Sequence, residues 1–364
     1  MVYAAVVVLR ARSISCLLLL SCACAPARSP QPVTAPPSTP STTSASIAGE
    51  SAKAAPQEPS PEPEPPSEPE EKAAEKAVAE PTVETSSSTS TSSSTSPAQR
   101  ELPRGGVRIF PQHRLVGFCG TPGAPKLGRL AGDLAARAKT IEGFAAKYAG
   151  DRKALPVFEL IAVVVQSWPG ADGKSRRRVN DSVVDDYLRA ARAARALLLL
   201  NIQPGHSNFL TEVKAFEKYL REPDVGVALD PEWAMSSAKQ KPGASFGHTS
   251  GKTINDVATY LSSLVAAGKL PEKLLVFHQV NSRVLRNEGE IAEHPGVVLV
   301  KSVDGLGNKK SKVQNYNALM KGTPKGVHPG FKLFFDEDVK GGFRLMEPRD
   351  VLGLTPTPDY VMYE

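Results

Sequence analysis

From about residue 107 to its end, the chain alternates between short apolar runs and amphipathic stretches. Eight apolar runs are typical of buried strands: Leu115–Gly120, Val157–Gln166, Ala196–Gln203, Val225–Asp230, Lys273–His278, Val297–Asp304, Phe331–Asp336 and Tyr360–Tyr363. The stretches between them have helical spacing: Leu127–Tyr148, Ser182–Ala194, Ser207–Arg221, Ile254–Ala267, Val284–Glu293, Lys310–Met320 and, most weakly, Phe343–Leu354.

Strands that are apolar throughout and separated by helices predict a parallel sheet covered on both faces. Eight such units favour closure into a (β/α)8 TIM-type barrel over an open, doubly wound sheet. The first strand is not followed by GxGxxG, the usual signature of a dinucleotide-binding sheet. We expect Gly105–Phe110 to add a small strand that closes the bottom of the barrel.

The first hundred residues lack the apolar side chains for a core. Fifteen of the 32 prolines fall between Pro26 and Pro97, and no Phe, Trp or Tyr occurs between Tyr3 and Phe110. Such a segment cannot offset the entropy of ordering. We therefore predict a disordered Pro/Ser/Thr/Glu-rich tether at 22–100 and a barrel domain at 101–364.

An export signal precedes the tether, because Arg10 and Arg12 come before an apolar run at Ile14–Leu20 that is too short to span a bilayer. The apolar stretch Val2–Leu9 ahead of the arginines leaves a later start codon open.

The run ends in Leu19-Leu20-Ser21-Cys22, which resembles the lipobox of bacterial lipoproteins. The resemblance implies a signal peptide at 1–21, acylation of Cys22 and a lipid-anchored chain on the extracytoplasmic side of the membrane. Cys24 is a weaker alternative. Cys119 is then the single cysteine of the barrel domain, so no disulfide forms within it, and its apolar strand predicts a core residue.

Charge is distributed unevenly. Residues 1–99 hold six basic residues and ten glutamates, a net charge of −4, whereas residues 100–364 hold 38 basic and 28 acidic residues, a net charge of +10. A basic domain suits an anionic surface such as a wall polymer, although solubility explains it equally well. The one basic run, Arg176–Arg178, lacks interleaved aromatics, so we expect no nucleic-acid partner.

Active sites of such barrels lie at the C-terminal ends of the strands, where this chain places polar residues. Side chains of this kind are typical of carbohydrate sites. The candidates for substrate binding are Gln203, Trp233, Gln279, Asp304, Glu337 and Tyr363.

Asp230 and Glu232 form the sharpest candidate. Two residues apart on an extended strand, they point to the same side, and the small Gly226 and Ala228 share that parity. Two close carboxylates should separate in pKa, leaving one protonated as a general acid. The alternative is that Asp230 caps the next turn while Glu232 faces solvent. Trp233 is either a sugar platform or a packing residue.

A second pairing places Glu232 opposite Glu337 or Asp336 across the barrel. A gap of about 5 to 5.5 Å would suit a retaining glycosidase, and a wider gap an inverting one. If Leu333 and Phe335 pack outward, Asp336 and Asp338 face inward and Glu337 does not.

His278 has inward parity, where a neutral imidazole could bind a substrate hydroxyl or shuttle a proton; a structural histidine is the alternative. Neither HxH nor HExxH spacing occurs, so we expect no metal and no other cofactor. The sequence gives no indication of the oligomeric state.

The domain resembles a group of uncharacterised secreted proteins and lipoproteins of high-GC bacteria. The resemblance rests on the strings Gly120–Gly123, Gln203–Ser207, Ala228–Trp233, Phe277–Gln279, Asp304–Gly307 and Phe335–Asp338. More broadly it resembles glycoside-hydrolase barrels. The Asp230/Glu232 pair is similar to the strand-four acids of family 18 chitinases, in which the Glu is the acid and the Asp assists the acetamido group. The longer acidic run of that signature is missing here, and Pro231 stands where clan A hydrolases have an Asn.

The sequence thus predicts a lipid-anchored envelope barrel that binds or hydrolyses a glycan. Glu232 is the expected acid, Asp230 or Asp336 its anionic partner, and His278 and Gln203 positioning groups. Two alternatives remain: a non-catalytic envelope module that holds a glycan or a protein, and a metal-dependent ester or phosphodiester hydrolase.

Overall fold

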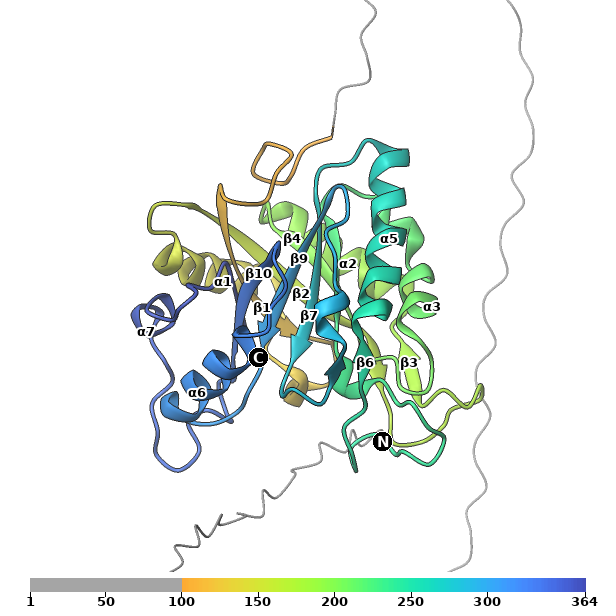
Figure 1. Ribbon diagram of the computed structural model, residues 1–364. Helices are drawn as coiled ribbons and strands as arrows, with labels where there is room; N and C mark the ends of the chain where they lie inside the picture. Colours follow the sequence, from red (N-terminus) through yellow and green to blue (C-terminus); the bar gives the residue numbers. More distant parts are fainter. Residues whose placement is uncertain (1–99) are drawn as a thin grey trace, which may run out of the picture. The chain divides into compact units, whose positions relative to one another are not determined.

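The computed structural model describes residues 100–364, which form a closed barrel of eight parallel strands (Figure 1). In barrel order the strands are β1 (His113–Gly120), β2 (Lys153–Val165), β4 (Leu197–Ile202), β5 (Val225–Leu229), β7 (Lys273–Gln279), β9 (Val297–Val303), β10 (Val327–Leu333) and β11 (Tyr360–Tyr363). Closure is seen at Leu115, which pairs with Tyr360 on one side and Leu155 on the other. The predicted (β/α)8 fold and all eight strands are confirmed.

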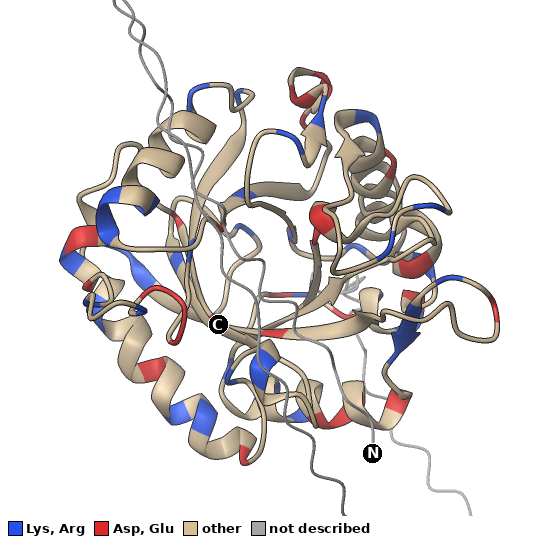
Figure 2. Cartoon of the chain, turned by 90° about the horizontal axis from the view of Figure 1, so that it is seen from below, with Lys and Arg blue, Asp and Glu red and all other residues tan. Residues whose placement is uncertain are grey.

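Helices surround the ring of strands, as the view along the barrel shows (Figure 2). They are α1 (Leu134–Tyr148), α2 (Asp181–Ala193), α3 (Phe209–Lys214), α4 (Glu217–Leu220), α5 (Gly251–Gly268), α6 (Lys309–Met320) and α7 (Pro348–Leu352). Short pieces lie in the loops: η1 (Pro125–Leu127), β3 (Arg176–Arg178), η2 (Pro231–Trp233), β6 (Thr249–Ser250), β8 (Leu285–Arg286) and η3 (Glu288–Glu290).

The structure corrects several predicted elements. The expected helix at Val284–Glu293 is absent: β8 pairs with β6, and Asn287 has φ 50°, a left-handed conformation that a helix does not tolerate. The first helix begins only at Leu134, because Asp133 caps it by accepting from two backbone N–H groups. The predicted helix Ser207–Arg221 is divided into α3 and α4.

The bottom of the barrel is closed without the strand predicted at Gly105–Phe110. That segment forms turns, but Leu102, Ile109 and Phe110 are buried in one cluster with inward-facing strand residues. The backbone N–H of Ile109 donates to Glu272 at 2.7 Å, and Phe110 packs on the His328 ring. These contacts close the barrel at the end where the strands begin.

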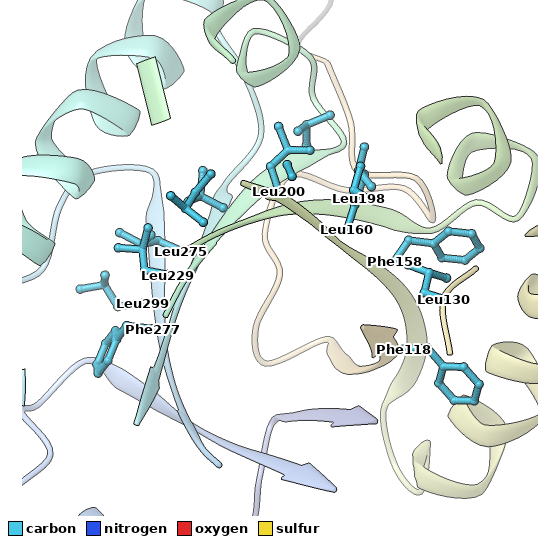
Figure 3. Close-up of a cluster of buried hydrophobic side chains, with 14 of the residues drawn as sticks. Phe118, Leu130, Phe158, Leu160, Leu198, Leu200, Leu229, Leu275, Phe277 and Leu299 are labelled. Atoms are coloured by element: carbon cyan, nitrogen blue, oxygen red, sulfur yellow. The ribbon is translucent and has the colours of Figure 1, made fainter. Parts of the chain in front are cut away.

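Side chains alternate between two apolar layers along each strand. Those that point away from the barrel, such as Phe118, Leu200 and Phe277, pack against the helices (Figure 3). Those that point inward, such as Leu155 and Val276, fill the lower barrel. Cys119 is fully buried among the inward residues, as expected, and burial raises its pKa well above the usual value.

The predictions for the signal peptide, for Cys22 and for the tether concern residues 1–99, which lie outside the described part of the chain. Among residues 100–364, no helix is both long and apolar enough to span a bilayer.

We expect Phe277→Ala to lower the free energy of unfolding by about 3 to 5 kcal/mol, because the ring is fully buried in the outer layer. Phe343→Ala, the same change at a ring that is 51% exposed, should alter it by less than about 0.5 kcal/mol. Urea unfolding followed by circular dichroism measures both, and equal losses would contradict the packing described.

Candidate active site

The inner face of the barrel changes from apolar to polar toward the C-terminal ends of the strands. Along β2 the inward residues are Leu155, Val157 and then Glu159, and along β7 Val276 is followed by His278. The buried polar side chains gathered there are Glu159, Asn201, Gln203, Asp230, Glu232, His278, Ser302, Asp304 and Lys332, joined by the half-buried Glu364. This polar cluster lies at the end of the barrel where barrel enzymes carry their active sites.

His278 lies between two carboxylates. Its Nδ1 is 2.8 Å from Asp304 Oδ2, and its Nε2 is 3.2 Å from Glu159 Oε1, an ion-pair contact without hydrogen-bond geometry. Burial alone would lower the pKa of His278, but Asp304 and Glu159 raise it well above its usual value. The two carboxylates therefore favour the imidazolium over the neutral, proton-shuttling imidazole expected from sequence.

Glu159 is held as an anion. Asn201 Nδ2 donates to its Oε1 at 3.0 Å, and the Tyr360 hydroxyl donates to its Oε2. Burial would raise the pKa of this carboxyl, but His278, Lys332 and the hydroxyl lower it to about 2. Sequence reasoning missed Glu159 because it lies inside an apolar run. Its parity with Leu155 and Val157 is the signal that marks it as inward-facing.

Lys332 is the second cation of the polar cluster. Its Nζ is 2.6 Å from Glu364 Oε2 and 3.5 Å from Asp304 Oδ2. Burial would lower the pKa of the ammonium, but these carboxylates raise it well above its usual value. Asp304 also accepts from Ser302 Oγ at 2.8 Å, and although burial would raise its pKa, His278 and Lys332 lower it.

Asp230 is oriented by two amides. Asn201 Nδ2 donates to its Oδ1 and Gln203 Nε2 to its Oδ2, each at 3.0 Å. Gln203 is itself fixed because its Oε1 accepts from the backbone N–H of Val165 at 3.2 Å. Burial raises the pKa of Asp230, while His278 counteracts part of this shift. The amide contacts make Gln203 a positioning group for this carboxyl.

Glu232 is the carboxyl with the fewest partners. It is 8% exposed, and its Oε2 is buried without a hydrogen-bond partner. Burial, followed by the charges of Asp230 and Asp304, raises its pKa well above the usual value, which favours the protonated form of the group. Pro231–Trp233 forms a 3-10 turn rather than the expected strand, yet both carboxyls are buried at the mouth. Asp230 makes no side-chain cap to this turn.

The cluster therefore contains two kinds of carboxyl group. His278 and Lys332 lower the pKa values of Glu159 and Asp304, whereas the pKa of Glu232 is raised well above its usual value. A protonated acid beside an oriented carboxyl can donate a proton to a leaving group while its neighbour faces the positive charge that develops.

The structure does not bring the acids of the seventh strand into the cluster. β10 ends at Leu333, so its inward residue is Lys332, and the chain then leaves the barrel. The Asp336 side chain is 78% exposed and pairs with Arg129, while Glu337 pairs with Lys340. The pairing of Glu232 with Asp336 or Glu337 is thus wrong as a geometric prediction.

Three further candidates lie elsewhere. Tyr363 points outward, where its hydroxyl is 2.6 Å from that of Tyr148 and its ring stacks on Phe335. Gln279 is buried on the face of β7 opposite His278, with its Oε1 unpartnered. Trp233 follows Glu232 in η2 and is half-buried. Within residues 100–364, no group of three or more His, Cys, Asp or Glu side chains is arranged to hold a metal ion.

Comparisons of the sequence with known proteins find no relative. No family model matches the chain, and no curated protein matches it. Among solved structures, it is similar to a GH18 chitinase from Pseudoalteromonas aurantia, with 11% identity over 69% of this chain and 93% of that chain, at a TM-score of 0.35. That similarity is too low to transfer an activity, so the function must be argued from the side chains.

We expect opposite stability effects for Glu232→Gln and Glu159→Gln at pH 7. The folded-state pKa of Glu232 lies above its ordinary 4.5, so this carboxyl costs stability as the pH rises past 4.5, and the amide removes that cost. The folded-state pKa of Glu159 is about 2, so its carboxylate stabilises the fold above the ordinary pKa, on the order of 3 kcal/mol, and this is lost as the pH falls toward 2. Urea unfolding between pH 3 and 8 measures both effects; shifts of the same sign at pH 7 would contradict the assignment.

His278 should remain doubly protonated between pH 6 and 8 in the intact protein. Asp304→Asn should lower its pKa, because the carboxylate on Nδ1 is the larger of the two attractions that raise it. Nitrogen-15 NMR of the imidazole across this range measures the pKa. The matched control is Asp336→Asn, which removes an exposed carboxylate and should leave the titration unchanged; a neutral ring in the unsubstituted protein would refute the imidazolium.

Proposed function

We propose that this chain is a glycoside hydrolase-like enzyme that acts on a polysaccharide of the cell envelope. The observation that carries the proposal is Glu232: a buried carboxyl with a raised pKa, an unpartnered Oε2 and a second oriented carboxyl, Asp230, beside it. These are the properties of a general acid for glycosidic bonds, which must hold a proton at neutral pH.

In this proposal Glu232 donates its proton to the glycosidic oxygen as the bond to the anomeric carbon breaks. Asp230, aligned by Asn201 and Gln203, faces the positive charge that develops on the sugar ring. Water supplies the hydroxyl group that the anomeric carbon gains, and the remaining proton of that water returns to Glu232. Low exposure strengthens the electrostatic effect of Asp230, because the surroundings exclude solvent.

His278 and Lys332 act through the other carboxylates in this proposal. They keep Glu159 and Asp304 ionised. The Asn201 side chain links Glu159 to Asp230, because its Nδ2 donates a hydrogen bond to each carboxyl. A negative charge at Asp304 in turn helps to keep Glu232 protonated. The two cations are thus positioning residues for the acid.

The proposed location is the extracytoplasmic side of a membrane. It is supported by the signal-like residues 1–21 and by the lipobox-like sequence that ends at Cys22. The Pro/Glu/Ser/Thr-rich residues that follow would give the barrel reach into the envelope.

A second candidate function is a non-catalytic module that holds an envelope polymer or a partner protein at the same mouth. It is favoured by the enclosure of the cluster, since neither Asp230 nor Glu232 exceeds 8% exposure. Binding by such a module would persist in Glu232→Gln and would weaken with salt.

The test incubates the full chain with peptidoglycan, chitin, arabinogalactan, and α- and β-glucans, with release of fragments read by mass spectrometry. Removing the proton donor in Glu232→Gln should lower the rate on the accepted polymer by about 100-fold or more. The matched control, Glu337→Gln, makes the same change at an acid outside the cluster and should retain the rate. Equal rates for Glu232→Gln and the unsubstituted chain would exclude Glu232 as the acid, and polymer binding without any release would favour the non-catalytic module.

A further inference from the structure

Two hollows of about 720 and 740 Å³ open at the C-terminal rim of the barrel, beside the polar cluster. Both are lined by Ser236, Ser237 and Gln240, so they lie on either side of one segment, and we call them together the rim cleft. None of the carboxyls of the polar cluster lines it. The cleft is therefore a separate feature that adjoins the site.

The walls of the rim cleft are held by hydrogen bonds among three loops. The His206 ring contacts Ser175 Oγ at 3.1 Å and the Gln240 carbonyl at 3.0 Å, and its backbone N–H donates to the Lys174 carbonyl at 2.7 Å. The preceding Gly205 has φ 57°, and a Cβ there would lie 2.4 Å from that carbonyl. These contacts fix the loops that line the first hollow before a ligand binds.

The cleft is joined directly to the turn that carries Glu232. Gly247, a lining residue, donates its N–H to the Glu232 carbonyl at 2.6 Å. A Cβ at Gly247 would lie 2.1 Å from the Ala234 carbonyl, so only glycine permits this close approach. Met235, which lines the other hollow, follows Glu232 by three residues. The cleft therefore adjoins the turn that carries Glu232, although the Glu232 side chain lines neither hollow.

The lining of the cleft is cationic. It includes Lys174, Lys241, Arg283 and Arg286 but neither aspartate nor glutamate. Among the residues from 100 to 364, no carboxylate lies within 4 Å of any of these four cations, in contrast to nearby Arg176, which pairs with Asp172 and Glu212. Four unpaired cations around one cleft favour an anionic ligand.

The cleft also presents two aromatic rings to solvent. Trp168 is 43% exposed and Phe246 is 46% exposed, one in each hollow. Exposed rings beside hydroxyl and amide groups, here Ser236, Ser237 and Gln240, present a flat apolar face with polar groups at its edge. Sugar rings have the same combination of an apolar face and a polar edge.

We infer that the rim cleft binds an anionic polysaccharide, a glycan that carries carboxylate or phosphate groups. Its sugar faces lie on Trp168 and Phe246, and its anionic groups contact Lys174, Lys241, Arg283 and Arg286. The inference rests on the proposed function, because it names the class of polymer that the acid at Glu232 would act on.

The test measures the affinity of the full chain by isothermal titration calorimetry for three polymers of similar length. Polygalacturonate carries carboxylates, poly(glycerol phosphate) substituted with sugars carries phosphates, and carboxyl-reduced polygalacturonate is neutral. We expect one of the two anionic polymers to bind at least roughly tenfold more tightly than the neutral one, which also identifies the anionic group. Equal binding of all three would overturn the inference.

Variants then locate the binding. The double variant Arg283→Gln/Arg286→Gln should weaken binding of the preferred polymer by roughly tenfold. Lys139→Gln/Lys147→Gln makes the same change of net charge on helix α1, away from the cleft. This control should change the affinity for the polymer by no more than about twofold. Equal losses in both double variants would show attraction by net charge alone and would overturn the inference.

Two further measurements separate this inference from the proposed function. Trp168→Ala should lower the affinity for the polymer, because it removes a ring on which a sugar would lie. Single-stranded DNA of matched charge should bind less tightly than the glycan. Equal affinity for DNA would overturn the assignment to a glycan. Cleft-dependent binding without any cleavage would support the rim cleft while contradicting the glycoside hydrolase.

Discussion

The site depends on the neutralisation of buried carboxylates by two buried cations. Ionised groups inside a barrel lose their hydration, and that loss is recovered only through close partners. His278 and Lys332 are those partners, with Asp304 shared between them. Glu232 has no ion pair with either cation, and burial together with the neighbouring carboxylates raises its pKa instead.

This arrangement follows from the way a barrel fills its interior. The lower inward positions carry apolar side chains, and small residues such as Ala228 occupy the strand that leads to Asp230. The polar positions begin only where the strands end, and there the amides of Asn201 and Gln203 tie neighbouring strands together through Asp230. The loops that follow continue the same order outward, from a mostly acidic interior to a cationic rim.

Much of the fold could be read from sequence because a buried parallel strand leaves a strong apolar signal. Asp230, Glu232, His278, Gln203 and Asp304 were found for the same reason, since each follows or ends such a run. Glu159 was missed because an apolar run conceals a single charge within it. Asp336 was misplaced because the alternation of side chains shows direction but not where a strand stops, and the inward acid expected there is replaced by Lys332 of the same parity.

The charge state of the histidine could not be inferred from a single strand. Its partners, Asp304 and Glu159, come from β9 and β2, and only closure of the barrel brings them to the two ring nitrogens. The loops were equally unreadable: the segment 284–293 has helical spacing, yet its pairing with β6 decides its conformation. Tertiary contacts therefore determine both the electrostatics of the site and the walls beside it.

The central claim is that Glu232 holds a proton at neutral pH. Infrared difference spectroscopy measures this directly, through the carbonyl stretch that only a protonated carboxylic acid has. At pH 7 the account predicts such a band in the unsubstituted protein and in Glu337→Gln, and its loss in Glu232→Gln. A band that persists in Glu232→Gln, or a protein without any such band, would contradict it.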